Sequence, residues 1–374
     1  MSALAAIADE VKAARDSGTS LRLAGSGTWL DAGRPVRDGA TLSLAGTRGV
    51  VHYEPGDLTL TVGAGTTLGA LRALTAANRQ WLPLDPFGSD DGTIGATVAT
   101  SSSGPLATGF GTPRDQVLGC TFVTGTGDVV TAGGRVVKNV AGFDLTRLMI
   151  GAWGTLGALT ELSLRVRAVP DADVTLIVPL EGAGSVQHAW RWLRQSDYRP
   201  MAAELLSPAL SEMLALSRVA TLAVRLGGSS ALVAAAQGSL ASVGTVTETS
   251  SDAWQALRRA EPAGAHVLRL STRPSRIAAL WESVSGFGEG DGWSHASLAR
   301  GVIRCVVPAG PDAPARVTRL LALRAPDVSC IVERASDDTW RRIPSPVSND
   351  LSRRVRDTFD PSRVLNRGIL GEAS

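Results

Sequence analysis

Three segments in the first half of the chain combine glycine with hydroxyl side chains, and this combination can hold the phosphates of a nucleotide. Glycine lets the backbone approach a ligand closely, and consecutive N–H groups form a cradle for an anion. The first segment follows a strand expected at residues 21–24, and it lacks the third glycine of a dinucleotide fingerprint and the lysine of a P-loop. A pyrophosphate cradle and a plain tight turn are both open. Its candidate binding residues are Ala24, Gly25, Ser26, Gly27, Thr28 and Trp29.

The second segment covers residues 85–104 and is rich in small side chains. Thr93 is placed to cap a helix over residues 94–99, whose N-terminal N–H groups would favour an anion. The small side chains would let a flat ligand or another backbone lie close, and residues 109–115 continue the same irregular wall. The candidate binding residues in this segment are Asp85, Pro86, Thr93, Ile94, Gly95, Thr100, Ser101, Ser102, Ser103 and Gly109.

The third segment covers residues 136–166. It begins with a polar cluster, continues as a helix-like run and reaches a turn with three glycines within seven residues, after which a strand is expected. Such a density of glycine indicates backbone that passes close to a phosphate, a nucleotide or another backbone. Lys138, in the polar cluster with Asn139 and Asp144, could lie beside a ligand or form a salt bridge. The candidate binding residues of the turn are Gly154, Thr155, Leu156, Gly157 and Leu159.

The elements around these segments predict an α+β fold. Short strands, one helix at residues 66–78 and a hairpin at 121–131 are expected in the first part, which excludes a doubly wound parallel sheet. Most of the 41 glycines precede residue 170, where we expect a domain boundary. The second part repeats strand–helix–strand units, which indicates an antiparallel sheet backed by helices. The polar tail at residues 357–368 could be a surface hook or a segment that returns to the first domain.

In their order and spacing, the three segments resemble the flavin-binding domain of the vanillyl-alcohol oxidase and PCMH-type FAD-binding superfamily. The runs 138–147 and 154–161 look more narrowly like the FAD-binding subunit of glycolate oxidases, to which glycolate and D-lactate dehydrogenases are related. The resemblance covers residues 20–168 well, and the tail is similar to the C-terminal segment of that superfamily. It implies a two-subdomain PCMH-type FAD-binding domain at 1–168, an α+β cap domain with an antiparallel sheet at 169–340, and a C-terminal segment at 341–374 that returns to the FAD domain.

The resemblance also implies roles for the candidate residues. Residues 25–29 would hold the FAD pyrophosphate, residues 85–93 and 100–103 would line the diphosphate and isoalloxazine side, and residues 154–159 the adenosine side. No histidine or cysteine lies in or near the first glycine loop, so non-covalent FAD is expected. The cluster of Phe143, Asp144 and Arg147 would brace the fold or touch substrate.

The second part of the chain offers few groups for acid–base chemistry. The related dehydrogenases carry a histidine-rich HxxGDGNxH motif in the cap for metal and substrate, whereas this chain has one isolated histidine there, His295, in an expected turn at residues 291–295. Arg300 and Arg304 could bind a carboxylate or face solvent. No metal site is expected, and the catalytic residues are unknown.

The composition limits the compartment and the partners. A net charge of +2 gives no electrostatic reason to expect nucleic acid. The three cysteines form no CxxC pair, which argues against zinc or iron–sulfur ligation and favours buried thiols in a reducing compartment. Residues 1–18 predict an amphipathic helix and not a signal peptide, and no apolar run of about 18 residues suggests a membrane span. We expect a cytoplasmic protein that reaches the inner face of the plasma membrane only through a partner.

The leading functional hypothesis is an FAD-binding subunit of a glycolate oxidase type complex. The resemblance implies oxidation of glycolate or a similar 2-hydroxy acid to the 2-oxo acid, with electrons passing through flavin to an iron–sulfur subunit. A larger catalytic flavoprotein subunit is the other implied partner, because the missing cap histidines favour a supporting role for this chain. The alternatives are a self-sufficient FAD-dependent dehydrogenase with a different proton acceptor and a non-catalytic assembly subunit.

Overall fold

The computed structural model describes residues 2–36, 39–134, 143–182, 184–285, 292–345 and 350–371. The chain divides into two compact units. Unit 1 consists of Met1–Ser103, Gly111–Val169 and Ile343–Ser374, and unit 2 consists of Gly104–Phe110 and Pro170–Arg342. Residues 104–110, which lie inside the predicted first domain, therefore belong to unit 2. Lys138 and Asn139 lie outside the described residues.

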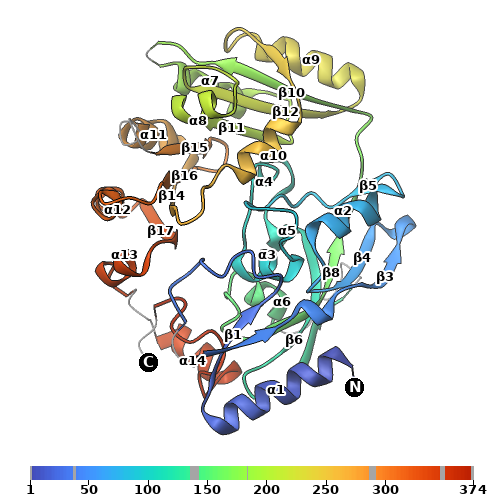
Figure 1. The fold of residues 1–374 in the computed structure, drawn as a ribbon. Helices are drawn as coiled ribbons and strands as arrows, with labels where there is room; N and C mark the ends of the chain where they lie inside the picture. Colours follow the sequence, from blue (N-terminus) through green and yellow to red (C-terminus); the bar gives the residue numbers. More distant parts are fainter. Residues whose placement is uncertain are drawn as a thin grey trace. The chain divides into compact units, whose positions relative to one another are not determined.

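A five-stranded antiparallel sheet forms the main layer of unit 1, in the order β3-β4-β8-β6-β7 (Figure 1). The helices α2 (Leu68–Ala76), α3 (Ile94–Thr100) and α6 (Leu145–Met149) share a buried apolar core with the middle strands. Burial of this apolar surface is the main force that holds the layer together. The strands are β3 (Val50–Glu54), β4 (Thr59–Gly63), β8 (Ala158–Arg165), β6 (Val117–Val123) and β7 (Val129–Gly133).

A second layer of unit 1 joins the first and last segments of the chain. Helix α1 (Ala3–Ser17) is capped by Ser2 and ends at Gly18, whose φ of 70° is left-handed, as the sequence predicts. Strands β1 (Ser20–Ala24) and β2 (Gly39–Ser43) pair in parallel. Apolar side chains of α1, β1 and β2 share a buried cluster with Val364 and Leu365 of the tail. The smaller elements are η1 (Ala45–Thr47), η2 (Pro55–Asp57), β5 (Gln80–Trp81), α5 (Pro113–Gln116), β9 (Arg167–Ala168) and α14 (Asp350–Phe359).

Unit 2 is built on an eight-stranded antiparallel sheet in the order β13-β10-β12-β11-β15-β16-β14-β17 (Figure 1). Helix α9 packs on β10 and β12, and α12 packs on β14 and β16. The strands are β10 (Ala172–Pro179), β11 (Ala202–Leu206), β12 (Thr221–Gly228), β13 (Thr247–Thr249), β14 (His266–Thr272), β15 (Trp293–Ser297), β16 (Val302–Val307) and β17 (Val328–Arg334). The helices are α4 (Ala107–Phe110), α7 (Ser185–Gln195), α8 (Pro208–Met213), α9 (Ser230–Leu240), α10 (Asp252–Arg259), η3 (Pro274–Arg276), α11 (Ile277–Ser285), α12 (Ala313–Leu321) and α13 (Asp337–Arg342).

The predicted α+β fold with an antiparallel sheet in the second part of the chain is confirmed, and so is the burial of the three free cysteine thiols. The turn expected at residues 291–295 is wrong, because Trp293–Ser297 forms β15 and pairs with β11 on one side and β16 on the other. Arg300 lies in the turn after this strand, so Arg300 and Arg304 do not occupy alternating positions of one strand. Within the described ranges, no helix has both the length and the apolar character needed to cross a bilayer.

Candidate functional site

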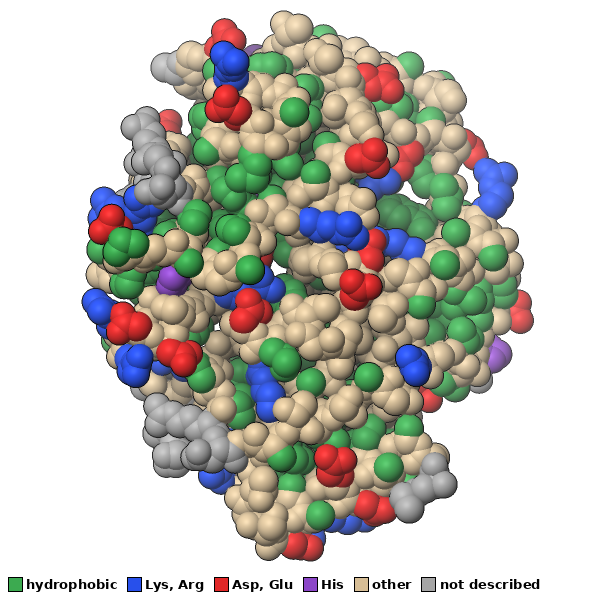
Figure 2. Space-filling model, in the orientation of Figure 1, with side chains coloured by type: hydrophobic (Ala, Val, Ile, Leu, Met, Phe, Trp, Pro, Cys, Tyr) green, Lys and Arg blue, Asp and Glu red, His purple; other side chains and the backbone are tan. Residues whose placement is uncertain are grey.

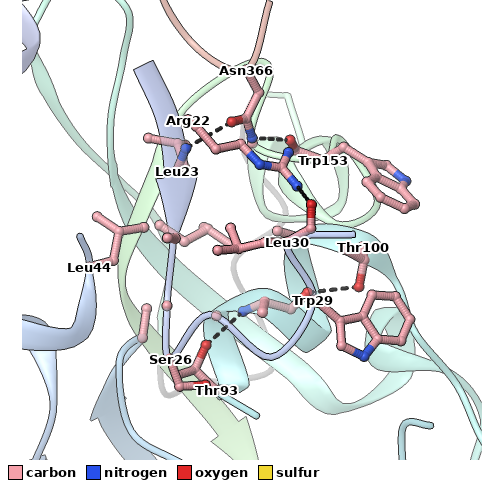
Figure 3. A pocket seen from close by; sticks show the side chains of 18 of the residues that line it. Arg22, Leu23, Ser26, Trp29, Leu30, Leu44, Thr93, Thr100, Trp153 and Asn366 are labelled. Atoms are coloured by element: carbon pink, nitrogen blue, oxygen red, sulfur yellow. Dashed lines mark hydrogen bonds between the residues drawn. The ribbon is translucent and has the colours of Figure 1, made fainter. Parts of the chain in front are cut away.

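A pocket of unit 1 lies at the carboxyl end of β1 and encloses about 720 Å³, including the part that opens to solvent. Its walls come from stretches far apart in sequence: the end of β1 with the loop after it, α3, the turn that holds Trp153, and the tail (Figure 3). All three segments predicted from the sequence therefore contribute to one pocket.

The first wall is the loop at residues 25–29. Gly25 lies so close to α3 that a Cβ atom at this position would overlap Thr93 Oγ1 and come within 2.9 Å of Thr93 Cγ2. Gly27 has a φ of 82°, a left-handed conformation that glycine adopts without steric cost. The two glycines are thus needed for different reasons, one for close packing and one for backbone conformation.

The second wall is α3, which begins at the predicted cap. The Thr93 side chain accepts a hydrogen bond from Ala96 N at 3.3 Å. The anion site expected at this helix terminus is not available, because Ile94 N and Gly95 N donate to carbonyl oxygens of Thr66 and Ala64 at 2.9 and 2.8 Å. The backbone N–H groups of the first turn of α3 are thus already hydrogen-bonded. The loop at residues 25–28 remains the candidate site for an anion.

The third wall is the glycine-rich turn after α6. Gly151 N donates to Val98 O at 3.1 Å and Trp153 N donates to Ala99 O at 2.8 Å, so the turn is fastened to α3 by its backbone. Trp153 and Gly154 have φ angles of 54° and 68°, and the left-handed conformation is unusual for a bulky residue such as tryptophan. Strained backbone of this kind gathers at ligand sites, where the surrounding structure holds it in place.

Arg22 is a pocket residue that sequence reasoning missed. Its Nη2 donates to Leu30 O and Ala32 O, both at 3.2 Å, and so ties the far end of the first loop back to β1 (Figure 3). Burial lowers the pKa of Arg22 and the nearby Asp31 carboxylate acts to raise it, but a guanidinium keeps its charge at neutral pH. The pocket thus contains a fixed positive charge next to the candidate cradle. Side chains alternate between the two faces of a strand. This alternation, applied to the strand expected at residues 21–24, could have identified Arg22 as a candidate.

The structure brings many of the predicted site residues together. Lining the main pocket are Ala24, Gly25, Ser26, Gly27, Thr28, Trp29, Thr93, Gly95, Thr100, Gly154, Gly157 and Leu159. A smaller adjoining pocket of about 280 Å³ shares Trp29, Thr93 and Thr100 with it and is also lined by Pro86 and Ser102. The residues that line neither pocket are Asp85, Ile94, Ser101, Ser103, Thr155 and Leu156 in unit 1 and Gly109 in unit 2. Besides Arg22, the main-pocket residues that were not predicted are Leu23, Leu30, Leu44, Ala64, Ala96, Ala99, Trp153, Asn366 and Ile369.

The predicted cluster of Phe143, Asp144 and Arg147 divides in the structure. Asp144 caps α6 by accepting a hydrogen bond from Arg147 N at 2.9 Å, and the two side chains form an ion pair at 3.2 Å. The Phe143 side chain is 95% exposed, so it does not brace the fold within the described residues. The contacts of Asp144 and Arg147 lie within α6 and at the surface, so they stabilise the start of this helix locally.

The residues of the main pocket fit FAD. Gly25 lines the pocket and packs directly against Thr93, and it has no side chain. The wall at this position therefore consists of loop backbone. Backbone N–H groups, hydroxyls and Arg22 suit a pyrophosphate, while Leu44, Ala96 and Leu159 offer apolar contacts for flat rings. When bound, FAD supplies a two-electron acceptor.

Unit 2 contains buried ionisable groups on one sheet. His295 Nδ1 lies 2.7 Å from Glu204 Oε2, and both side chains are buried. This contact orients the imidazole ring beside the carboxylate. Among the described His, Cys, Asp and Glu side chains, no group of three or more is arranged to hold a metal ion.

Arg304 forms a separate buried cluster and does not face solvent. Its Nε lies 2.5 Å from Glu261 Oε1, and its Nη1 lies 2.5 Å from Glu333 Oε2. Arg269 and Arg334 pair with the same two carboxylates at 3.4 Å. The site is an ion-pair network, so Arg304 is not placed as a solvent-facing carboxylate receptor.

Figure 2 shows one face of the molecule. Acidic and basic side chains are interspersed on it, and neither sign forms a continuous area among the residues drawn in colour. This arrangement fits the net charge of +2. The face shown has no extended basic surface of the kind that binds a phosphate backbone.

Comparison with known proteins agrees with this geometry. Residues 2–133 match the family described as FAD binding domain, which spans the first loop and α3 and ends before the third wall. The glycolate oxidase subunit GlcE of Escherichia coli is 40% identical over 173 residues, or 46% of this chain and 49% of that protein. The chain thus spans about half the length of this relative.

Two further similarities extend over nearly the whole chain. An uncharacterized FAD-linked oxidoreductase of Mycobacterium tuberculosis is 28% identical over 413 residues, or 97% of this chain and 88% of that protein. The solved structure of alkyldihydroxyacetonephosphate synthase superposes with a TM-score of 0.72 at 16% identity and covers 96% of this chain and 74% of that one, which shows the fold. The predicted fold, the FAD cofactor and the class of FAD-dependent oxidoreductase agree with these findings. Residues 2–133 therefore match an FAD-binding domain, and FAD is the cofactor that these comparisons indicate.

Proposed function

We propose that this chain is the FAD-binding subunit of a complex that oxidises glycolate or a similar 2-hydroxy acid to the 2-oxo acid. The observation that carries the proposal is the single pocket built from three separate glycine-containing segments, inside a domain that matches the FAD binding domain family. The glycolate oxidase subunit GlcE is a relative by sequence. Its name supplies the reaction class and the assignment to a complex.

Within the pocket, we assign the loop at residues 25–29 and Arg22 to the FAD pyrophosphate. Residues 93–100, with Pro86 and Ser102 of the adjoining pocket, are assigned to the isoalloxazine side, and Gly154, Gly157 and Leu159 to the adenosine side. The FAD is held without a covalent bond, since no histidine or cysteine is present among the lining residues. These assignments follow the chemistry of the walls. Hydrogen-bond donors are assigned to the phosphates of FAD, and small or apolar side chains are assigned to its ring systems.

The proposed partners are a larger catalytic flavoprotein subunit and an iron–sulfur subunit that takes the electrons onward. The proposed location is the cytoplasm, with contact to the inner face of the plasma membrane through those partners. The three buried thiols support a reducing compartment.

A self-sufficient dehydrogenase is the second candidate, and the buried His295–Glu204 pair favours it. Oxidation of an alcohol carbon releases the hydroxyl proton, and an imidazole oriented by a carboxylate is a side chain suited to accept it. The two candidates differ in whether this chain alone consumes substrate.

Anaerobic reduction of the purified chain separates the two candidates. The protein is expected to be yellow, and glycolate or D-lactate is expected to bleach it only when the partner subunits are added. Bleaching of the isolated chain would favour the self-sufficient enzyme, and His295→Asn should then slow reduction by about 100-fold or more, since general bases contribute about 10²–10⁴. His188→Asn, at an exposed histidine of the same unit, is the control. A colourless protein that takes up no added FAD would refute both candidates.

A further inference from the structure

Asn366 connects two walls of the main pocket through its side chain. Its Oδ1 accepts a hydrogen bond from Leu23 N at 2.8 Å, and its Nδ2 donates to Trp153 O at 2.7 Å (Figure 3). Leu23 belongs to the strand that leads into the first loop, and Trp153 belongs to the glycine-rich turn. The oxygen and the nitrogen of one side-chain amide thus join backbone from two different walls of the pocket.

The backbone around this contact is held in strained conformations. Trp153 and Asn366 are both left-handed, with φ angles of 54° and 44°. A Cβ atom at Gly154 would lie 2.8 Å from Asn366 Nδ2, so the glycine next to Trp153 is the residue that leaves room for the amide. Strain of this kind persists only where the surrounding contacts fix it, and it gathers at ligand sites.

The tail also fixes the position of Asn366 before any ligand binds. Leu21 N donates to Val364 O at 2.6 Å, and Asn366 N donates to Leu21 O at 2.8 Å, so residues 364–366 run beside β1. The fully buried Asp360 carboxylate accepts hydrogen bonds from Val364 N and Leu365 N at 2.9 and 3.0 Å. Asn366 itself is 4% exposed. The Asn366 side-chain amide is therefore held at the pocket wall by contacts that exist before a ligand binds.

We propose that residues 360–369 act as a clasp that sets the spacing of the two FAD-binding walls, with Asn366 as its positioning residue. This inference rests on the proposed binding of FAD in the pocket. A docked tail favours FAD because it holds the first loop and the glycine-rich turn at the distance that the bound cofactor needs. By linkage, bound FAD favours the docked tail by the same factor. Dissociation of FAD and release of the tail are then coupled, so that each process favours the other.

The test compares the full-length wild-type chain with Asn366→Ala and with Asn78→Ala. Asn78 is the matched control, because it carries the same side chain at an exposed position of unit 1 and lines neither pocket. Titration of apoprotein with FAD, followed by flavin fluorescence, is expected to give a Kd raised about tenfold or more for Asn366→Ala, from the loss of two part-buried hydrogen bonds. Asn78→Ala is expected to stay within about twofold of wild type, as surface substitutions usually do.

Hydrogen exchange supplies a readout that a merely structural role would not move. FAD is expected to slow exchange at residues 364–369 of the wild-type chain and to leave it unchanged in Asn366→Ala. If that variant does not fold, Asn366→Asp keeps an acceptor for Leu23 N but replaces the donor to Trp153 O by a second acceptor oxygen, and it should also weaken FAD binding. Wild-type affinity in the variants, or unchanged tail exchange on adding FAD, would overturn the clasp alone. A wild-type chain that binds no FAD would overturn the proposed function first.

Discussion

Gly25→Ala is expected to yield a protein that purifies largely without flavin. The added Cβ would overlap Thr93 Oγ1, and the same oxygen caps α3 by accepting from Ala96 N. Either the loop moves away from α3 or the cap breaks, and both changes deform the wall assigned to the pyrophosphate. Overpacking of this kind costs about 1–3 kcal/mol, which corresponds to a loss of about 5- to 150-fold in affinity if the cost falls on the bound state.

The measurement is the Kd for FAD, with Gly46→Ala as the matched control. Gly46 lies in the same unit, and a Cβ there meets nothing within 4 Å. The control should bind FAD like the wild type. Retention of wild-type affinity by Gly25→Ala would show that the loop at residues 25–29 does not carry the cofactor, even if FAD binds elsewhere in unit 1.

Arg304→Met is expected to lower the free energy of unfolding of unit 2 by about 3–5 kcal/mol at neutral pH, because it leaves two buried carboxylates without their main partner. Glu261 and Glu333 both lie 2.5 Å from the Arg304 guanidinium. Urea denaturation followed by tryptophan fluorescence measures the loss. Arg218→Met is the control, since the Arg218 side chain is 91% exposed. A loss below about 1 kcal/mol would mean that the network relaxes or takes up water.

The pH dependence of this variant has a definite sign. Burial acts to raise the pKa of Glu333, but Arg304 and Arg269 outweigh it, so the pKa lies below the ordinary value. A lowered folded-state pKa stabilises the fold above the unfolded pKa of about 4.3, and this stabilisation is lost as the pH falls through the folded value. In Arg304→Met burial prevails, so the carboxyl is easier to protonate. The stability difference between wild type and variant is therefore expected to shrink on acidification from pH 7 toward pH 4.

The parts of the site that the sequence predicts are those with a local cause. Thr93 was expected to cap a helix, because a hydroxyl residue before a run of small residues has a preferred conformation of its own. The glycines of the loop and the turn signal unusual backbone geometry wherever they occur. Local causes are visible in a single stretch of sequence, and the predictions based on them located the pocket.

The parts that sequence reasoning missed depend on distant partners. Asn366 and Leu23 are 343 residues apart, and nothing near either residue indicates their hydrogen bond. Arg304 meets Glu261 across 43 residues, so its burial as an ion pair could not be told from a solvent-facing position. Gly109 was assigned to the pocket because it lies near other glycines in sequence, yet the chain enters unit 2 at that point. Residues that are close in sequence can therefore belong to different units of the structure.

The return of the tail to β1 also determines the order in which this protein can mature. Strand β1 is synthesised early, but its partner at residues 364–366 follows roughly 20–70 s later at about 5–20 residues per second. During that interval the strand edge beside Leu21 has no partner from the tail, while most of unit 2 has already emerged. Flavin loading is therefore expected to be a late event in biosynthesis, and a ribosome stalled before residue 364 would display a chain with low affinity for FAD.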